Sequence, residues 1–199
     1  MTQQDFLALS EGARRLESDG FGPKVLALAD GTMIKLFRRK RLISSAALFP
    51  YASRFARNAQ KLHQLGIPAP VVIQVARIDG MARDMVHYRP LPGETLRELL
   101  EAGLAAERLQ ALKAQFTRFV IRLHDAGVYF RSLHLGNVVL TPEGELGLID
   151  FSDLRVYPWR LGAYLRARNM RRLQGIDRER EWFDRAVVLA AARKRRGGH

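Results

Sequence analysis

The chain has 199 residues, enough for one substantial core or for two small lobes. Its composition, 47% apolar and 27% charged, is ordinary for a globular protein, and no apolar run approaches the roughly 18 residues of a membrane-spanning helix. The lack of cysteine excludes disulfides and thiolate metal sites, and the N-terminus lacks the basic start and apolar stretch of a secretory signal. These features predict a cytoplasmic protein.

The net charge of +13 is concentrated in two segments. Residues 155–199 hold twelve arginines and one lysine against four acidic residues, a net charge of +9, and residues 35–61 include the run FRRKR and no acidic residue. Such asymmetry favours an anionic partner, which could be nucleic acid, an anionic membrane surface or a phosphorylated substrate. The alternative interpretation is a solvated surface that keeps the protein in solution.

The segment KVLALADGTMIKLF predicts a β-hairpin that turns at Asp30-Gly31 and carries Lys35 on its second strand. Just before it, Gly20 and Gly22 lie in a turn whose backbone amides could approach a phosphate. A lone G-x-G is weak evidence for a phosphate site, and a plain turn without a ligand is the more common explanation.

The middle of the chain alternates helices and strands. The pattern predicts a helix over residues 45–65, a strand after LGIPAP, a second strand that ends in a Pro/Gly connector at 90–93, and a short helix that begins near Thr95. We expect the connector to be a hinge between two lobes. A long amphipathic helix follows over 105–125, and Gly127 lies where a helix terminator belongs.

A second hairpin follows, in which the turn TPEGE joins the apolar runs NVVL and LGLIDF. Asn137 precedes this hairpin and Asp150 follows it, so a tight hairpin would bring an amide oxygen and a carboxylate to the same end. Oxygen ligands of this kind suit Mg²⁺, which keeps waters and substrate phosphates in its shell. The arginine-rich remainder, from Trp159 onward, is predicted to be helical.

As a set, these motifs resemble a protein-kinase-like phosphotransferase, and specifically the small bacterial lipopolysaccharide-core kinases typified by 3-deoxy-manno-octulosonic acid (Kdo) kinase. The resemblance covers most of residues 12–176 and is carried by DGTMIKLF, LGIPAP, LPGETLRELL, LHDAGVYFRSLHLGN, LGLIDFSD and RARNMRRL. It implies that Lys35 holds the α- and β-phosphates of ATP and that Asn137 and Asp150 hold magnesium. It also assigns the glycine-loop role to Gly20 and Gly22 and places the nucleotide beside Tyr88.

The catalytic loop departs from the family at the position of the general base. The pattern H-R-D-x-x-x-x-N appears as Phe130-Arg131-Ser132-Leu133-His134-Leu135-Gly136-Asn137, so a serine replaces the aspartate and the base is missing. His134 is the nearest titratable group and could serve in its place, or it could only hydrogen-bond within the loop. If the missing acceptor is the only defect, Ser132→Asp should raise turnover, because Arg131 and Asn137 already set the loop.

Two further departures concern the remaining motifs. No Asp or Glu occurs between Leu36 and Ile78, so the usual glutamate partner of Lys35 is absent. Ser152 replaces the glycine after Asp150-Phe151, and only 47 residues follow it, too few for the full helical lobe of a peptide kinase. A small non-peptide substrate is therefore favoured.

The predicted fold is α+β and two-lobed, with a small antiparallel β lobe plus one helix over 1–92, a shortened helical lobe over 93–190, and a basic disordered tail over 191–199. The predicted function is an ATP- and Mg²⁺-dependent phosphotransferase acting on an anionic glycolipid or a lipopolysaccharide-core sugar at the inner face of the membrane, with peripheral contact with anionic lipid. The alternative is a pseudokinase scaffold that binds nucleotide or a protein partner in cell-envelope biogenesis. A nucleic-acid-binding protein is the third candidate, and no zinc-finger or RNA-binding fingerprint supports it.

Overall fold

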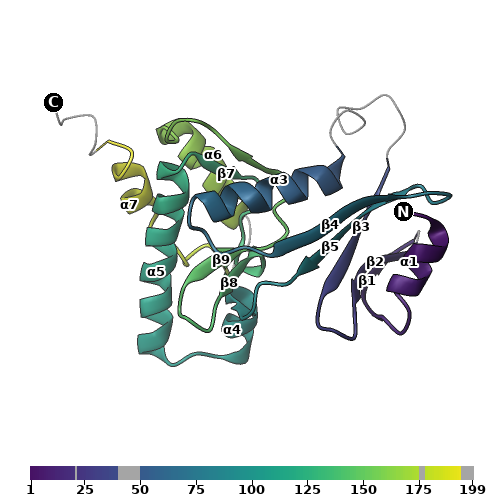
Figure 1. Ribbon diagram of the computed structural model, residues 1–199. Coiled ribbons are helices and arrows are strands. Elements are labelled where there is room, and N and C mark those ends of the chain that lie inside the picture. Colours follow the sequence, from purple (N-terminus) through teal and green to yellow (C-terminus); the bar gives the residue numbers. More distant parts are fainter. Residues whose placement is uncertain (21, 40–49, 175–177, 194–199) are drawn as a thin grey trace. The chain divides into compact units, whose positions relative to one another are not determined.

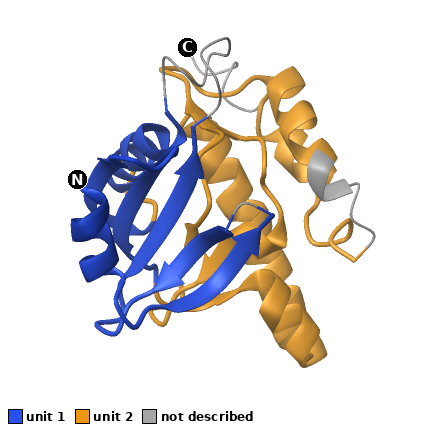
Figure 2. Ribbon diagram, turned by 90° about the vertical axis from the view of Figure 1, so that its right-hand side faces the viewer, with its two compact units in different colours: residues 1–64, 69–91 blue, residues 65–68, 92–199 orange. Residues whose placement is uncertain are grey.

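The structure is a computed structural model of the whole chain that describes residues 1–20, 22–39, 50–174 and 178–193. It is a mixed α+β protein that divides into two compact units (Figure 2). Unit 1 comprises Met1–Gln64 and Ala69–Leu91, and unit 2 comprises Leu65–Pro68 and Pro92–His199. The predicted tail from residue 194 and the predicted start of the helix at 45–49 lie outside the described residues.

Unit 1 consists of a five-stranded antiparallel sheet with two described helices (Figure 1). The strand order is β1-β2-β3-β5-β4, with every neighbouring pair antiparallel. The elements are α1 (Gln3–Leu9), β1 (Arg14–Asp19), β2 (Gly22–Ala27), β3 (Met33–Arg38), α3 (Tyr51–Gln64), β4 (Val71–Ile78) and β5 (Arg83–Arg89).

The predicted hairpin at Asp30-Gly31 is confirmed, with Ala27 opposite Met33 in the β2–β3 register. The Asp30 carboxylate closes the turn by accepting hydrogen bonds from Thr32 N at 2.9 Å and Thr32 Oγ1 at 2.6 Å. Gly31 adopts a φ of 80°, which glycine accepts without the steric cost that a side chain would bring. Local turn chemistry therefore fixes this register.

The core of unit 1 fills the space between α1 and the sheet, and it is made of Phe6, Leu26, Ile34, Leu36, Ile78 and Met85. The helix α3 packs against β4 and β5 and buries Phe55, whose ring is tilted against that of Tyr88 at a centroid distance of 5.4 Å. Strand β5 is buried from Arg83 to Tyr88: it has a neighbouring strand at each edge, Tyr88 packs against Phe55 of α3, and Met85 belongs to the core cluster that contains Phe6 of α1.

Unit 2 contains a three-stranded sheet in the order β6-β8-β9, a two-stranded sheet of β7 and β10, and four α-helices in its described part. Its elements are β6 (Glu94–Thr95), α4 (Leu96–Ala102), α5 (Ala106–Asp125), β7 (Val128–Phe130), the 3₁₀ turn η1 (Leu135–Asn137), β8 (Val138–Leu140), β9 (Leu146–Leu148), β10 (Leu154–Val156), α6 (Ala163–Gln174) and α7 (Arg185–Ala190). Among the described residues, no helix is both long enough and apolar enough to cross a membrane.

An N-cap begins α4 and a glycine ends α5, both at the positions that the sequence predicts. Thr95 caps α4 through a reciprocal pair of hydrogen bonds with Glu98. After α5, Gly127 has a φ of 76°, and a Cβ built on it would lie 2.2 Å from Tyr157 O and 2.7 Å from Trp159 O. Only glycine lets residues 157–159 cross the end of α5 this closely.

Candidate functional site

The loop that follows β7 is held at its start by Asn169 of α6. Asn169 Oδ1 accepts a hydrogen bond from Phe130 N at 3.3 Å, and Asn169 Nδ2 donates to Phe130 O. The Nε2 atom of His124 lies 3.1 Å from the same Oδ1, so three segments of unit 2 meet at one amide. Because Oδ1 can only accept, His124 carries its proton on Nε2.

His124 is completely buried, and burial is the main cause that lowers its pKa from 6.5 to about 4. The positive charge of Arg166 also lowers the pKa, whereas the bond to Asn169 and the charge of Asp125 raise it. The imidazole is therefore neutral at physiological pH, and it donates a fixed hydrogen bond to Asn169, which holds the start of the loop.

Asn137 lies at the end of the loop, and its orientation bears on metal binding. Its Nδ2 donates to Ser132 O at 2.9 Å. A carbonyl oxygen can only accept, so the amide nitrogen must face Ser132. Asn137 Oδ1 is consequently turned away from Ser132 and is the atom that a cation could use.

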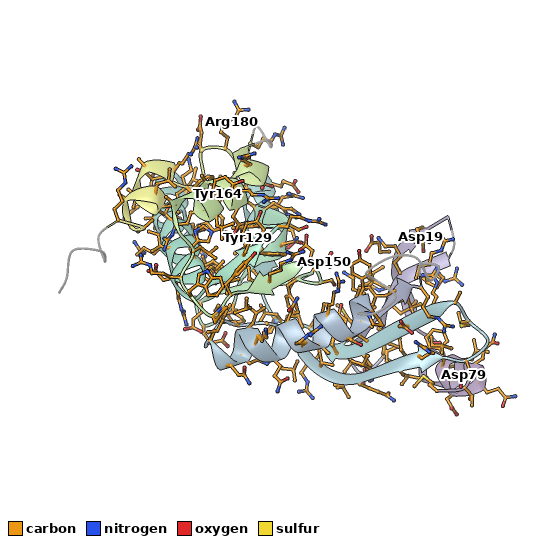
Figure 3. The ribbon with its side chains drawn as sticks, turned by 90° about the horizontal axis from the view of Figure 1, so that it is seen from above. Asp19, Asp79, Tyr129, Asp150, Tyr164 and Arg180 are labelled. Carbon is orange, nitrogen blue, oxygen red and sulfur yellow. The ribbon has the colours of Figure 1, made fainter. Side chains whose placement is uncertain are left out.

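Asp150 directly follows the residue that pairs with Asn137 across the hairpin. Val138 is opposite Leu148 in the β8–β9 register, and Ile149 N donates to Asn137 O at 3.1 Å. Asp150 has a φ of 49° and is the one non-glycine residue of the described chain with a positive φ. Backbone conformations of this kind concentrate at ligand-binding sites, and the Asp150 side chain is exposed (Figure 3).

Ser132 contacts a carboxylate that sequence reasoning did not identify. Its Oγ donates to Asp153 Oδ2 at 2.6 Å, a length typical of a charge-assisted bond. Arg131 Nε lies 3.3 Å from the same oxygen and forms an ion pair with it. The other oxygen, Asp153 Oδ1, is buried without a hydrogen-bond partner, as is Ser152 Oγ.

The far side of the loop is supported by a second ionic cluster. Glu179 is buried and accepts from Arg97 Nε at 2.9 Å, from Arg97 Nη2 at 2.6 Å and from Leu135 N at 2.9 Å. Arg97 Nη2 also lies 3.3 Å from His134 Nδ1, which must be the unprotonated ring nitrogen because the guanidinium only donates. His134 is therefore held within this cluster.

The arginines of α6 have different environments. Arg166 is completely buried, where it donates to Leu161 O at 2.8 Å and forms an ion pair with Asp125. Arg168 and Arg171 are exposed. The arginines of α6 therefore do not share one face of the helix.

The site residues predicted in the first ninety positions all lie in unit 1. Lys35 is half-buried on β3, opposite Val86 of β5, with its Nζ 5.9 Å from the centre of the Phe37 ring. Gly20 directly follows β1, and Gly22 is the first residue of β2, where it pairs with Asp19. Tyr88 is buried on β5, and its hydroxyl lies 3.6 Å from Met33 Sδ.

Asp153, Glu179, Asn169 and Arg97 are the polar residues around the loop that sequence reasoning missed. Their partners lie between 21 and 82 positions away in the chain, so no local pattern marks them. One signal was present for Asp153, because it directly follows LIDFS, the stretch to which the sequence resemblance assigns a metal-binding role.

Comparison with known proteins gives a limited result. No protein-family model matches the chain. A protein of Streptomyces coelicolor, named as a probable serine/threonine-protein kinase, is 31% identical over 110 residues, which are 53% of this chain and 16% of that protein. The chain thus matches only a small part of that protein's length, and the similarity supports a kinase-like relationship.

Proposed function

We propose that this protein is an ATP- and Mg²⁺-dependent phosphotransferase of the lipopolysaccharide-core sugar kinase type. One observation carries the proposal, the way in which unit 2 presents two oxygen ligands. The hydrogen bond from Asn137 Nδ2 to Ser132 O turns Asn137 Oδ1 away from Ser132, so that this oxygen could bind a cation. Asp150, whose φ is positive, directly follows Ile149, the residue bonded to Asn137 across the hairpin. The kinase-like similarity supports the same chemistry.

The two residues fit Mg²⁺ as it is usually held beside a nucleotide. Magnesium is commonly bound by one or two protein oxygens, and substrate phosphates and waters complete its octahedron. Among the described residues, no group of three or more His, Cys, Asp or Glu side chains is placed to hold a metal ion. Bound Mg-ATP would supply the transferable phosphoryl group and neutralise its charge.

The pair of Ser132 and Asp153 is proposed to receive the proton of the acceptor alcohol. The attacking hydroxyl would donate to Ser132 Oγ, while the serine proton moves along its existing 2.6 Å bond to Asp153 Oδ2. One O–H bond breaks and one forms at Ser132, and the proton ends on the carboxylate. A positioned base contributes about 10²- to 10⁴-fold to the rate, so this relay would restore what the serine alone cannot supply.

Lys35 is proposed to hold the ATP phosphates. No acid of α3 can orient it, because the described helix contains no Asp or Glu. Lys35 instead lies between two neighbouring strands, and its ammonium group approaches the Phe37 ring. The glycines of the β1–β2 turn, Gly20 and Gly22, are the proposed backbone contacts to phosphate.

The acceptor is proposed to be a sugar of an anionic envelope glycolipid, handled by a cytoplasmic enzyme at the inner membrane face. The motif resemblance and the net charge of +13 support this substrate class.

A pseudokinase scaffold is the second candidate, and one observation favours it. Arg131 forms an ion pair with Asp153 Oδ2, the same oxygen that would receive the proton, so proton transfer to this oxygen would weaken the ion pair. In that case the protein would bind nucleotide without turnover.

Two measurements test the proposal. Mg-ATP at about a hundred times its dissociation constant should raise the free energy of unfolding by roughly 2.7 kcal/mol, and Asp150→Asn should remove most of that gain. Glu143→Gln, which changes an exposed carboxylate in the β8–β9 turn, is the matched control. Transfer of the γ-phosphate of ATP to core oligosaccharide separates the enzyme from the scaffold, and an unchanged melting temperature with millimolar Mg-ATP would contradict both.

A further inference from the structure

A small hollow lies within unit 1, between the start of α3 and the strands β4 and β5. It has a volume of about 290 Å³, and the residues that line it include Ala52 and Ser53 of α3, Val75 and Arg77 of β4, and Asp84 of β5. Figure 1 shows α3 beside these two strands. Pockets for drug-sized ligands commonly measure about 300 to 1,000 Å³, so this hollow suits a small molecule.

The strand register brings a basic and an acidic side chain to this hollow. Arg77 is opposite Asp84 in the β4–β5 pairing, so the two side chains project from the same face of the sheet. Side chains alternate between the faces along a strand, so Tyr88 shares this face with Asp84. Tyr88 contacts the Phe55 ring of α3, which identifies the face as the one that α3 covers.

The Asp84 carboxylate is buried without the hydrogen bonds that a buried charge requires. Its side chain is only 7% exposed, and its Oδ1 has no hydrogen-bond partner among the described residues. Arg77 Nε lies 3.6 Å from this oxygen, which is an ion pair but is too long for a hydrogen bond. Because a buried charge without hydrogen bonds is unfavourable, a ligand that donates to Oδ1 would bind favourably.

The opposite wall of the hollow offers groups that suit an anion. The Arg77 side chain is 62% exposed, so its guanidinium can turn from Asp84 to a bound carboxylate. The first N–H groups of an α-helix have no partner within the helix, and α3 has no acidic residue in its first turn. Ala52 and Ser53 belong to this turn and line the hollow.

The remaining lining is apolar. Pro50 and Ala52 line the hollow on the side of α3, and Val75 lines it on the side of β4. Val75 is 39% exposed although it is a large aliphatic side chain. An aliphatic group in the hollow would cover it and remove this apolar surface from water.

We propose that this hollow binds a free α-amino acid with an aliphatic side chain. The ligand's ammonium group replaces Arg77 beside Asp84 Oδ1 and donates a hydrogen bond to it. The ligand's carboxylate accepts from the Arg77 guanidinium and from the first-turn amides of α3, and its side chain packs on Val75. One α-carbon carries both charges, which fits a site whose two charged residues are cross-strand neighbours. The proposal goes beyond phosphotransfer, because none of these residues has a part in that proposed reaction.

L-Leucine and its analogues test each contact separately. L-Leucine at about ten times its dissociation constant should raise Tm by about 3 to 6 °C, and calorimetric titration should give that constant. N-acetyl-L-leucine lacks the ammonium charge, and L-leucinamide and isoamylamine lack the carboxylate. Each of these three should bind at least about tenfold more weakly, because each loses a hydrogen-bonded charge. Glycine, which lacks the side chain, should also bind more weakly.

Asp84→Asn separates a binding role from a structural one. It should weaken leucine binding at least about tenfold, whereas the Tm of the ligand-free protein should stay the same or rise, because a buried charge without hydrogen bonds is removed. If Asp84 served the fold alone, the substitution would lower Tm.

Arg77→Gln tests the other end of the ligand at a mostly exposed side chain, and it should weaken binding about tenfold. The matched control, Arg15→Gln, removes the same charge from an exposed position of β1, the strand at the other edge of the sheet. It should change binding by less than about twofold, because salt screens charges at that separation. Circular dichroism checks that all variants are folded.

Three results would overturn the proposal. The first is the absence of any heat of binding or shift of Tm with millimolar L-leucine. The second is binding of isoamylamine or L-leucinamide as tight as that of leucine, which would assign the hollow to a cation alone, such as the lysine side chain of a protein partner. The third is an equal loss of binding in Arg77→Gln and Arg15→Gln, which would show a general charge effect.

Discussion

Placing an aspartate at position 132 tests the Ser132–Asp153 contact directly. The sequence alone predicts that Ser132→Asp restores a missing base and raises turnover. The structure adds a second carboxylate, because Ser132 Oγ lies 2.6 Å from Asp153 Oδ2. An aspartate at 132 would therefore face Asp153 at close range, and we expect the single variant to be destabilised.

The size of this destabilisation follows from Coulomb's law. Two like charges about 4 Å apart repel by about 4 kcal/mol at an effective dielectric constant of 20. Arg131 is mostly exposed, so its ion pair with Asp153 offsets at most about 1 kcal/mol. Sharing of one proton between the carboxylates relieves a further part, which leaves a destabilisation of about 2 kcal/mol. For a chain of this size, that lowers Tm by about 4 to 8 °C.

A double-mutant cycle measures the repulsion. Ser132→Asp should recover most of its lost stability when it is combined with Asp153→Asn, because the second carboxylate is then neutral. Ser132→Asn has the size of aspartate without the charge and serves as the control for crowding. In the Asp153→Asn background, the new aspartate should also raise transfer from ATP, by up to about 10²-fold.

The cycle has a clear contrary outcome. Ser132→Asp could cost the same stability with and without Asp153, or as much as Ser132→Asn. Either result would mean that the two side chains do not face each other. The proposed proton relay would then fail, while Mg-ATP binding through Asn137 and Asp150 would remain to be judged by its own assay.

Three further predictions concern the supports of the loop and the end of α5. Folding lowers the pKa of His124 from 6.5 to about 4, so the unfolded state takes up a proton before the folded state does as the pH falls. Lowering the pH from 6.5 to 4 should therefore reduce the free energy of unfolding by about 3 kcal/mol through His124 alone. Urea titrations of His124→Gln should show a flatter dependence of this free energy on pH. Arg97→Ala should lower the free energy of unfolding by about 3 to 5 kcal/mol, because it leaves the buried Glu179 carboxylate without its charge partner. Glu179→Ala leaves no buried carboxylate and should lower it by only about 1 to 3 kcal/mol. The reverse order in chemical denaturation would contradict this prediction. Gly127 and Gly144 both have a positive φ, but only at Gly127 would an added Cβ collide with backbone atoms. Gly127→Ala should therefore lower the free energy of unfolding by at least about 2 kcal/mol more than Gly144→Ala. Similar losses of thermal stability in the two variants would refute the crowding at Gly127.

The sequence by itself determines the local features of this protein. Asp30 and Gly31 specify the β2–β3 turn through their own side chain and backbone freedom, and Thr95 with Glu98 specifies the start of α4. The order of motifs also predicts that Asn137 and Asp150 flank one hairpin, because a short hairpin brings its two ends together. These predictions need only interactions between near neighbours in the chain.

Only the tertiary structure decides what surrounds the loop. Asp153 meets Ser132 because β10 pairs with β7, and Glu179 reaches Leu135 from a segment 44 positions away. The burial of Arg166 is likewise set by Asp125 on another helix, whereas the exposed arginines of the same segment have identical side chains. A charged side chain becomes buried where a distant partner offsets its desolvation, and the identity of that partner depends on packing that no local pattern encodes.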